Sequence, residues 1–251
     1  MTRQRILLGF VLLVLLVLLA GVAGRAAAEA TIPCGRTIAA TASLVAGEEP
    51  AWRGAIETQV ALNRTPPLYV GDPPDDGARP AAAVSLLSNG EATFVRMRWA
   101  DPTDSRARSP ERIADAGDST IYKAHSLDIE RFADAACVMF PQNVQNAQDA
   151  ASFPSLMMGD AAHPVDLYYW HGTRGFERLI AAGRGTTTRT GQAIPGSVRR
   201  TADGWECVFQ IPPAAAGTPI AFAVWDGEKQ QRDGLKFYSV WYELREIGGA
   251  P

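Results

Sequence analysis

Residues 84–99 read VSLLSNGEATFVRMRW and predict a β-hairpin. Asn89-Gly90 is typical of a type I′ turn, because this pair readily adopts positive φ angles. Along the second strand, every second residue from Thr93 to Trp99 belongs to a largely apolar face, and the face between them carries Arg96 and Arg98. A strand with one apolar and one charged face covers a core on one side only, so the hairpin predicts a layered β structure.

Five further segments have similar lengths and are bounded by Pro, Gly or Asp. They are residues 135–140, 165–170, 205–211, 220–225 and 236–244. Many short strands without a sustained 3.6-residue period predict an all-β fold, an antiparallel β-sandwich with long end loops. Minor helices are expected over residues 111–116, where Ser109-Pro110 could begin one, and over residues 176–182. The Gly- and Thr-rich residues 184–197 are expected to form an exposed excursion.

The composition excludes one class of partner. The 251 residues carry 24 basic and 27 acidic side chains, a net charge of −3, with no long Lys/Arg run. A nucleic-acid-binding protein normally has a basic patch, so no nucleic-acid partner is expected.

The N-terminus resembles an export signal. Arg3 and Arg5 precede the uncharged residues 6–24, and small residues in A-x-A patterns follow up to Ala30. This order is typical of a cleavable signal peptide, and the alternative is an uncleaved membrane anchor over residues 6–24. We therefore expect residues 1–30 to be a signal, residues 31–251 to form a single domain, and the protein to be periplasmic.

Familiar catalytic and metal-binding patterns are absent from the sequence. Cys34, Cys137 and Cys207 have no zinc-like or haem-attachment spacing, and a Cys34–Cys207 disulfide is a structural guess. The histidines are scattered, at positions 125, 163 and 171. Asp160, Asp166 and Asp226 could be imagined as the carboxylates of a glycosidase, but Asp226-Gly227 is better explained as a turn.

Two residues stand out as candidate ligands. Lys236 shares one face of the predicted strand 236–244 with largely apolar residues. It either extends to solvent at the strand end or is a desolvated, neutral amine. Met158 precedes Gly159-Asp160 at a predicted turn, where its thioether either fills a gap in the core or projects into a cavity as a soft ligand suited to haem iron.

Six segments in a fixed order resemble one family across roughly residues 84–245. They are residues 92–103, 134–141, 158–170, 204–209, 222–227 and 236–241. The family comprises the haem b-binding gamma subunits of ethylbenzene dehydrogenase, dimethylsulfide dehydrogenase, selenate reductase and chlorate reductase.

The resemblance implies a β-sandwich that holds one non-covalent haem b between a methionine and a lysine. By position these axial ligands are Met158 and Lys236, with Met157 as the fallback because the adjacent methionines leave the register open by one residue. It also implies a non-catalytic electron-transfer subunit. Its partners would be a molybdenum-containing catalytic subunit, an iron-sulfur subunit and an external cytochrome c or similar carrier.

The alternative function is a haem-free carbohydrate- or small-ligand-binding sandwich. In that case Trp170, Trp225 and Trp241 would form a flat platform for a sugar. Tryptophans at these positions are equally well explained as core residues.

Overall fold

The computed structural model describes residues 30–66, 76–106, 132–142, 154–231 and 233–248. The predicted signal or anchor and the helix expected over residues 111–116 therefore lie outside the described residues. Within the described ranges, no helix has the length and apolar character needed to cross a membrane.

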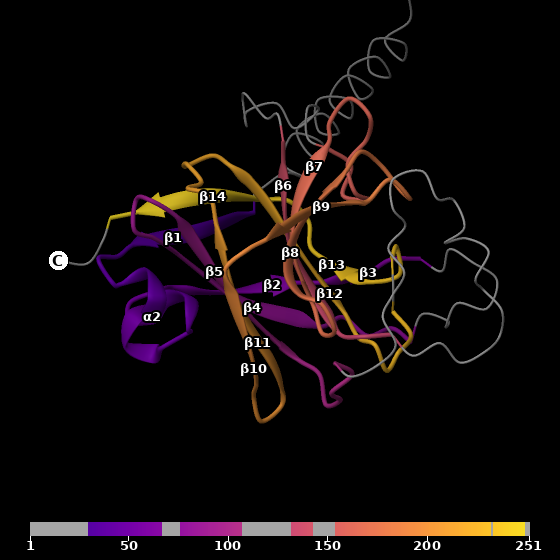
Figure 1. The fold of residues 1–251 in the computed structure, drawn as a ribbon, viewed down its shortest axis with the longest axis horizontal. Coiled ribbons are helices and arrows are strands. Elements are labelled where there is room, and N and C mark those ends of the chain that lie inside the picture. The colour runs from indigo at the N-terminus through magenta and orange to yellow at the C-terminus, as the bar shows by residue number, and fades with distance from the viewer. Residues whose placement is uncertain (1–29, 67–75, 107–131, 143–153, 232, 249–251) are drawn as a thin grey trace, which may run out of the picture. The chain divides into compact units, whose positions relative to one another are not determined.

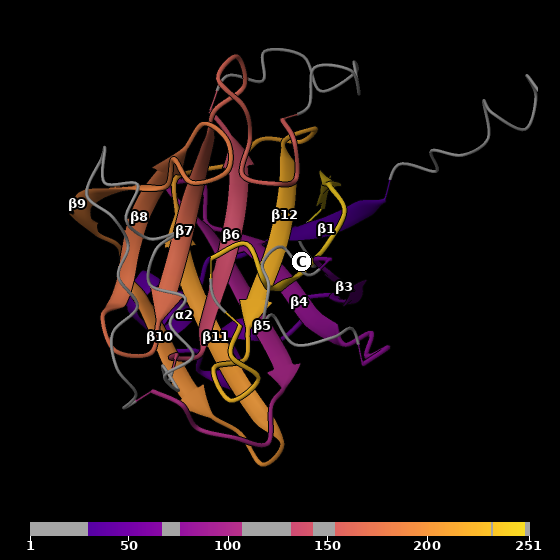
Figure 2. The same ribbon diagram turned by 90° about the vertical axis from the view of Figure 1, so that its right-hand side faces the viewer.

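The described strands form two sheets that join along one edge (Figure 1). In the first sheet the order is β10 (Gly196–Arg200), β11 (Gly204–Ile211), β5 (Thr93–Ala100), β4 (Ala81–Ser88), β1 (Thr31–Arg36) and β14 (Tyr242–Ile247), with β2 (Glu57–Ala61) also paired to β4. In the second sheet the order is β12 (Pro219–Trp225), β6 (Ala135–Pro141), β7 (Val165–His171), β8 (Gly175–Ala181) and β9 (Thr188–Ala193). Figure 2 shows β8, β7, β6 and β12 side by side.

The two sheets share strand β12. Its first residues, Pro219 and Ile220, pair with β14 of the first sheet, and residues 221–225 pair with β6 of the second. The short strand β13 (Phe237–Tyr238) also pairs with β12, and β3 (Asn63–Arg64) pairs with β13. Most pairs are antiparallel, while β1 runs parallel to both β14 and β4. The predicted all-β sandwich is confirmed.

The main core lies between the two sheets. Val95, Met97 and Trp99 of β5 face inward, as the alternation in the sequence predicts, and they meet Trp170 and Trp205. The ring centroids of Trp99 and Trp170 lie 6.2 Å apart, and those of Trp170 and Trp205 lie 5.4 Å apart. Burial of large aromatic side chains of this kind is a dominant stabilising contribution to such a core.

The second sheet is apolar on its outer face as well. All seven residues of β12 are buried, although successive side chains point to opposite sides of the sheet. Phe222 and Val224 belong to the main core, whereas Ala221, Ala223 and Trp225 belong to a separate apolar cluster with residues of β6, β7 and β8. An antiparallel sheet of a sandwich usually exposes one face to water, so this outer face marks a place where something else is packed.

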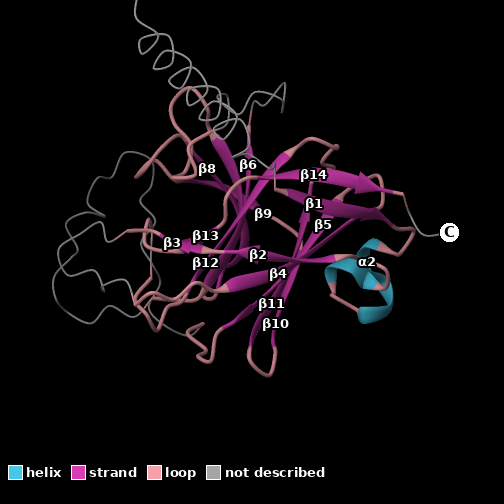
Figure 3. Cartoon of the chain, turned by 180° about the vertical axis from the view of Figure 1, so that it is seen from behind, coloured by secondary structure: helices cyan, strands magenta, loops and turns pink. Residues whose placement is uncertain are grey.

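Two short helical segments cover the outer face of the first sheet. They are α2 (Thr41–Val45) and the 3-10 helix η1 (Glu49–Trp52). Leu44 and Trp52 pack there against Phe94 and Val208, and the Trp52 indole N–H donates to the Leu44 carbonyl at 3.0 Å. Figure 3 shows how little of the described part of the chain is helical.

The predicted hairpin is present, but its turn differs from the prediction. Ser88 pairs with Thr93, so the loop has four residues, and only Gly90 of the Asn-Gly pair has a positive φ, of 90°. The Asn89 side chain instead accepts the backbone N–H groups of Glu91 and Ala92 at 3.1 and 3.0 Å. Asparagine stabilises such turns through its side chain, which the type I′ assignment overlooked.

Three other segments also differ from expectation. The helix expected over residues 176–182 is wrong, because residues 176–181 lie in strand β8, where Glu177, Leu179 and Ala181 are buried with a period of two. Residues 184–197 are largely exposed, as expected, but β9 lies within them and β10 begins at Gly196. The single strand expected over residues 236–244 is two strands, β13 and β14.

The break between β13 and β14 has a clear cause. Ser239 stops the strand by pairing with Phe222 of β12, donating its backbone N–H at 2.8 Å and accepting the Phe222 N–H on its hydroxyl at 2.9 Å. Val240 is then 47% exposed, and β14 begins at Tyr242 in the first sheet. The chain thus crosses from one sheet to the other, which an alternating sequence pattern does not reveal.

The guessed Cys34–Cys207 disulfide is wrong, because all three cysteines are buried free thiols. Burial raises the pKa of Cys34 to about 11 and that of Cys137 to about 12, and it raises the pKa of Cys207 well above its ordinary value. The thiolate is the reactive form, so these cysteines should be inert in the folded protein.

We expect iodoacetamide at pH 8 to leave the native chain unmodified and to alkylate all three cysteines after denaturation in guanidinium. Mass spectrometry of the intact chain would measure the added groups. Alkylation of only one cysteine in the denatured, unreduced chain would contradict the assignment of three free thiols.

Candidate functional site

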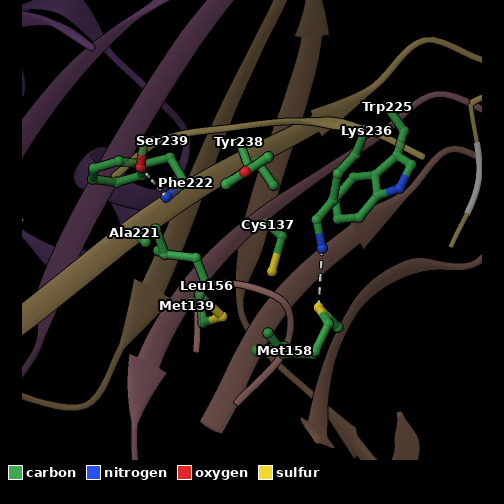
Figure 4. Close-up of a pocket in the computed structure, with 12 residues that line it drawn as sticks. Cys137, Met139, Leu156, Met158, Ala221, Phe222, Trp225, Lys236, Tyr238 and Ser239 are labelled. Atoms are coloured by element: carbon green, nitrogen blue, oxygen red, sulfur yellow. Dashed lines mark hydrogen bonds between the residues drawn. The ribbon is translucent and has the colours of Figure 1, made fainter. Parts of the chain in front are cut away.

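A small apolar pocket lies on the outer face of the second sheet (Figure 4). Its floor consists of alternate residues of β6 and β12, which are Cys137, Met139, Ala221, Ala223 and Trp225. The two alanines leave space that larger side chains at these positions would fill. The walls are formed by Leu156, Met158, Leu167, Phe222, Lys236, Tyr238 and Ser239.

Lys236 immediately precedes β13, and its side chain enters the pocket. Its backbone is held by Thr65, whose hydroxyl accepts the Lys236 N–H at 2.9 Å and whose N–H donates to the Lys236 carbonyl at 3.0 Å. The residue is 2% exposed, and its Nζ lies 5.2 Å from the centroid of the Trp225 ring. The amine is therefore buried in the pocket and does not extend to solvent. Burial of an ammonium group is costly, which makes this lysine unusual.

Met158 approaches from a tight turn over residues 155–159. The Gly159 N–H donates to the Ser155 carbonyl at 2.7 Å, and the Met158 carbonyl accepts the Gly183 N–H at 2.9 Å. Met158 has a φ of 78°, a left-handed conformation that is strained for any residue with a Cβ atom. Such strain persists where the surroundings impose it and is concentrated at functional sites.

Gly159 completes this turn and must be glycine. Its φ is 74°, and a Cβ atom on it would lie 2.6 Å from the His163 carbonyl oxygen. Met157, in contrast, does not line the pocket, and its N–H donates to the Ser155 hydroxyl at 3.2 Å. The structure thus directs one of the two adjacent methionines, Met158, into the pocket.

The two candidate ligands meet across the pocket. Lys236 Nζ lies 3.0 Å from Met158 Sδ, although 78 residues separate them in the sequence. A thioether and an amine that face each other between apolar walls are a donor set suited to haem iron. At 3.0 Å the two atoms leave no room for a metal between them. A bound haem would therefore require the Lys236 side chain to move away from Met158, or the Met158 turn to move away from Lys236.

The other candidate side chains do not converge on one site. Asp160 accepts the backbone N–H of Ala162 at 2.9 Å and lies 3.0 Å from His163 Nδ1, within one turn. Asp166 is paired with Arg178 at 2.7 Å, and Asp226 is grouped with other acidic residues. The glycosidase arrangement is therefore absent among these residues, and His125 lies outside the described ones.

The tryptophan platform is also wrong. Trp170 is 1% exposed and lies in the core between the sheets, whereas Trp225 lies on the opposite face of the second sheet beneath Lys236. Trp241 donates its indole N–H to the Pro154 carbonyl at 3.0 Å. These three rings therefore share no exposed surface.

One cluster of aspartates was not predicted from the sequence. Asp101, Asp134 and Asp226 bring carboxylate oxygens within 4.8 Å of one another. Each aspartate lies next to a strand end, at the C-terminus of β5 or β12 or at the N-terminus of β6. That shared position was the signal available in the sequence.

Comparison with known proteins identifies the family. A family model described as Ethylbenzene dehydrogenase matches residues 49–206, which include Met158. The chain belongs to this family. Within it, the chain is 31% identical over 238 residues to "Chlorate reductase subunit gamma" of Ideonella dechloratans, covering 88% of this chain and 89% of that protein.

The chain is also similar to two other proteins of known name. The chain is 32% identical over 216 residues to "Dimethylsulfide dehydrogenase subunit gamma" of Rhodovulum sulfidophilum, covering 75% of this chain and 70% of that one. It is 30% identical over 166 residues to a protein of Haloferax mediterranei named as a respiratory nitrate reductase heme subunit, covering 61% and 51%. A solved carbohydrate-binding protein from Bacteroides uniformis aligns over 89% of this chain and 96% of its own, with 10% identity and a TM-score of 0.47.

The strain at Met158 leads to a testable comparison of two variants. Met158→Ala keeps a Cβ atom in the left-handed conformation, whereas Met158→Gly removes it. We expect the haem-free Gly variant to have the higher free energy of unfolding, by about 1 kcal/mol, although it deletes more of the side chain. Urea denaturation would measure the difference. If the Ala variant is equally stable, Met158 is not held in the left-handed conformation in solution.

Proposed function

We propose that this chain is a haem b-binding, electron-transferring subunit of an oxidoreductase complex and is not itself the catalyst. The observation that carries the proposal is the meeting of Lys236 Nζ and Met158 Sδ, 3.0 Å apart, in an apolar pocket on the second sheet. The names of the relatives, two gamma subunits and one heme subunit, support the same function.

In this proposal Met158 and Lys236 are the two axial ligands of a non-covalent haem b. A bound haem supplies one-electron transfer, and its potential depends on the ligands and on the polarity of the pocket. The thioether and an unprotonated amine are both neutral, and burial disfavours the charged form of an amine. The apolar floor formed by Met139, Ala221 and Ala223 would exclude water from the site.

The proposed partners follow from the family. We infer a molybdenum-containing catalytic subunit and an iron-sulfur subunit on one side of the electron path, and a cytochrome c or similar carrier on the other. We further propose that residues 1–30 direct export, that residues 31–251 form the haem-binding domain, and that the complex functions in the periplasm. A membrane attachment would arise only if residues 6–24 stayed uncleaved.

Optical spectroscopy tests the central claim. The purified full chain, supplemented with haem, should give a b-type signal in the reduced-minus-oxidised spectrum and in a pyridine haemochrome assay. Absence of that signal after supplementation would overturn the proposal.

The ligand assignment is tested with four single variants. We expect Met158→Ala and Lys236→Ala to weaken haem binding by about tenfold or more, since loss of even a supporting residue around a metal site costs 10–100-fold. Met157→Ala and Lys229→Ala are the matched controls and should bind haem like the parent chain. Titration of the haem-free chain with haemin would measure the affinities. Unchanged binding in Lys236→Ala would remove that residue from the ligand set.

A further inference from the structure

Three aspartates meet at one end of the sandwich, apart from the residues that line the apolar pocket. Asp101 follows β5 of the first sheet, while Asp134 precedes β6 and Asp226 follows β12 in the second. Asp101 and Asp134 are 1% and 0% exposed, and one carboxylate oxygen of each aspartate lies within 4.8 Å of the others. Three carboxylates at this separation repel one another strongly when they are buried.

The surrounding backbone holds these carboxylates in place. Asp134 accepts the N–H groups of Ser105 at 2.7 Å and of Gly227 at 2.9 Å, one on each oxygen. Asp101 Oδ1 accepts both the N–H and the hydroxyl of Thr103, at 2.9 and 2.8 Å. The arrangement is therefore fixed by loops from both sheets.

Two oxygen atoms in this cluster are left without a hydrogen bond. Asp101 Oδ2 and the Ser105 hydroxyl are both buried, and neither has a hydrogen-bond partner among the described residues. Ser105 is 0% exposed and adjoins the cluster through its N–H bond to Asp134. A buried carboxylate oxygen without a hydrogen-bond partner is rare and costly. These atoms therefore point to a bound group that oxygen atoms can coordinate.

Among the described residues, the positive side chains that act on the cluster are Lys229, Arg200 and Arg106, and none of the three is buried. Lys229 Nζ pairs with Asp226 at 3.2 Å but is about half exposed. Arg200 acts on Asp101 from farther away, yet burial and Asp226 still raise the pKa of Asp101. Burial, together with Asp101 and Asp226, raises the pKa of Asp134 to about 6.

We propose that Asp101, Asp134 and Asp226, with the Ser105 hydroxyl, bind a hard divalent cation of the calcium type. All four groups offer oxygen, the donor that Ca²⁺ and Mg²⁺ require, and no soft ligand takes part. A cavity of about 310 Å³ lined by Asp101, Asp226, Lys229 and Trp99 gives the ion a route from solvent.

The cation would tie the ends of β5, β6 and β12 together and so connect the two sheets. The loops here are already closely packed, because a Cβ atom on Gly227 would lie 2.1 Å from the Phe132 carbonyl oxygen. Asp226 also begins the segment that leads to Lys236, and Gln231 accepts the Asp226 N–H at 3.0 Å. The site would therefore fix one end of the segment that carries the lysine of the apolar pocket.

Calcium titration of the full chain tests the site directly. After treatment with a chelator, calorimetry should detect one Ca²⁺ per chain, and added Ca²⁺ should raise the melting temperature. Tb³⁺ in place of Ca²⁺ should luminesce on tryptophan excitation, because Trp99 lines the same cavity. If neither Ca²⁺, Mg²⁺ nor Mn²⁺ binds at millimolar concentration, the proposal is overturned, whatever the haem content of the chain.

Variants locate the site. Asp101→Asn should weaken Ca²⁺ binding by tenfold or more, about 1.4 kcal/mol, whereas Asp166→Asn, the same change in the Arg178 ion pair at the far end of β7, should leave it unchanged. Ser105→Ala removes only a hydroxyl without a hydrogen bond and should weaken binding while the chain stays folded. If Asp101→Asn fails to fold, Ser105→Ala decides. Binding equal to that of the parent chain in the folded variants would overturn the assignment of these residues.

Discussion

Strands β12, β6 and β7 of the second sheet are buried on both faces, and the rest of the structure depends on that constraint. Strand β12, which the two sheets share, has no exposed residue, and its side chains alternate between the core and the pocket. One face of the second sheet is buried in the main core, against the first sheet. The other face needs a cover of its own, and the turn that carries Met158 and the chain around Lys236 supply part of it. An apolar cofactor would meet the same requirement, because each square ångström of apolar surface removed from water adds to stability.

The pocket is formed by two local compromises. Met158 adopts a left-handed conformation beside Gly159, which orients its thioether toward the sheet. Lys236 lies just before β13, ahead of the point where the chain passes from the second sheet to the first, with its backbone held by Thr65 and its amine buried. Neither feature improves stability by itself, since one stores strain and the other buries a polar group. Their coincidence at one site is the reason why we propose a functional role for this pocket.

Much of the fold could be predicted from local patterns, because strand alternation and turn residues are written in neighbouring positions. The hairpin over residues 84–99 and its inward face follow from a period of two. The strand β8 was missed because a short mixed segment has no decisive period. The sequence singled out Lys236 and Met158 one at a time, but only the pairing of β12 with β6 and β13 places them across one pocket. The aspartate cluster was missed for the same reason, since each member alone is indistinguishable from a turn residue.

The parallel position of β1 has a consequence for how the chain folds. Residues 31–35 pair with residues 243–247, so the first strand of the sheet borders the last. β1 can meet β4 early, but its other edge stays open until the C-terminal strand arrives and, through β14, joins the first sheet to β12. Contacts between such distant residues slow folding and leave an unpaired edge exposed in the meantime. A chain that loses its last residues would therefore lose the closure of the sandwich, and not merely a loose end.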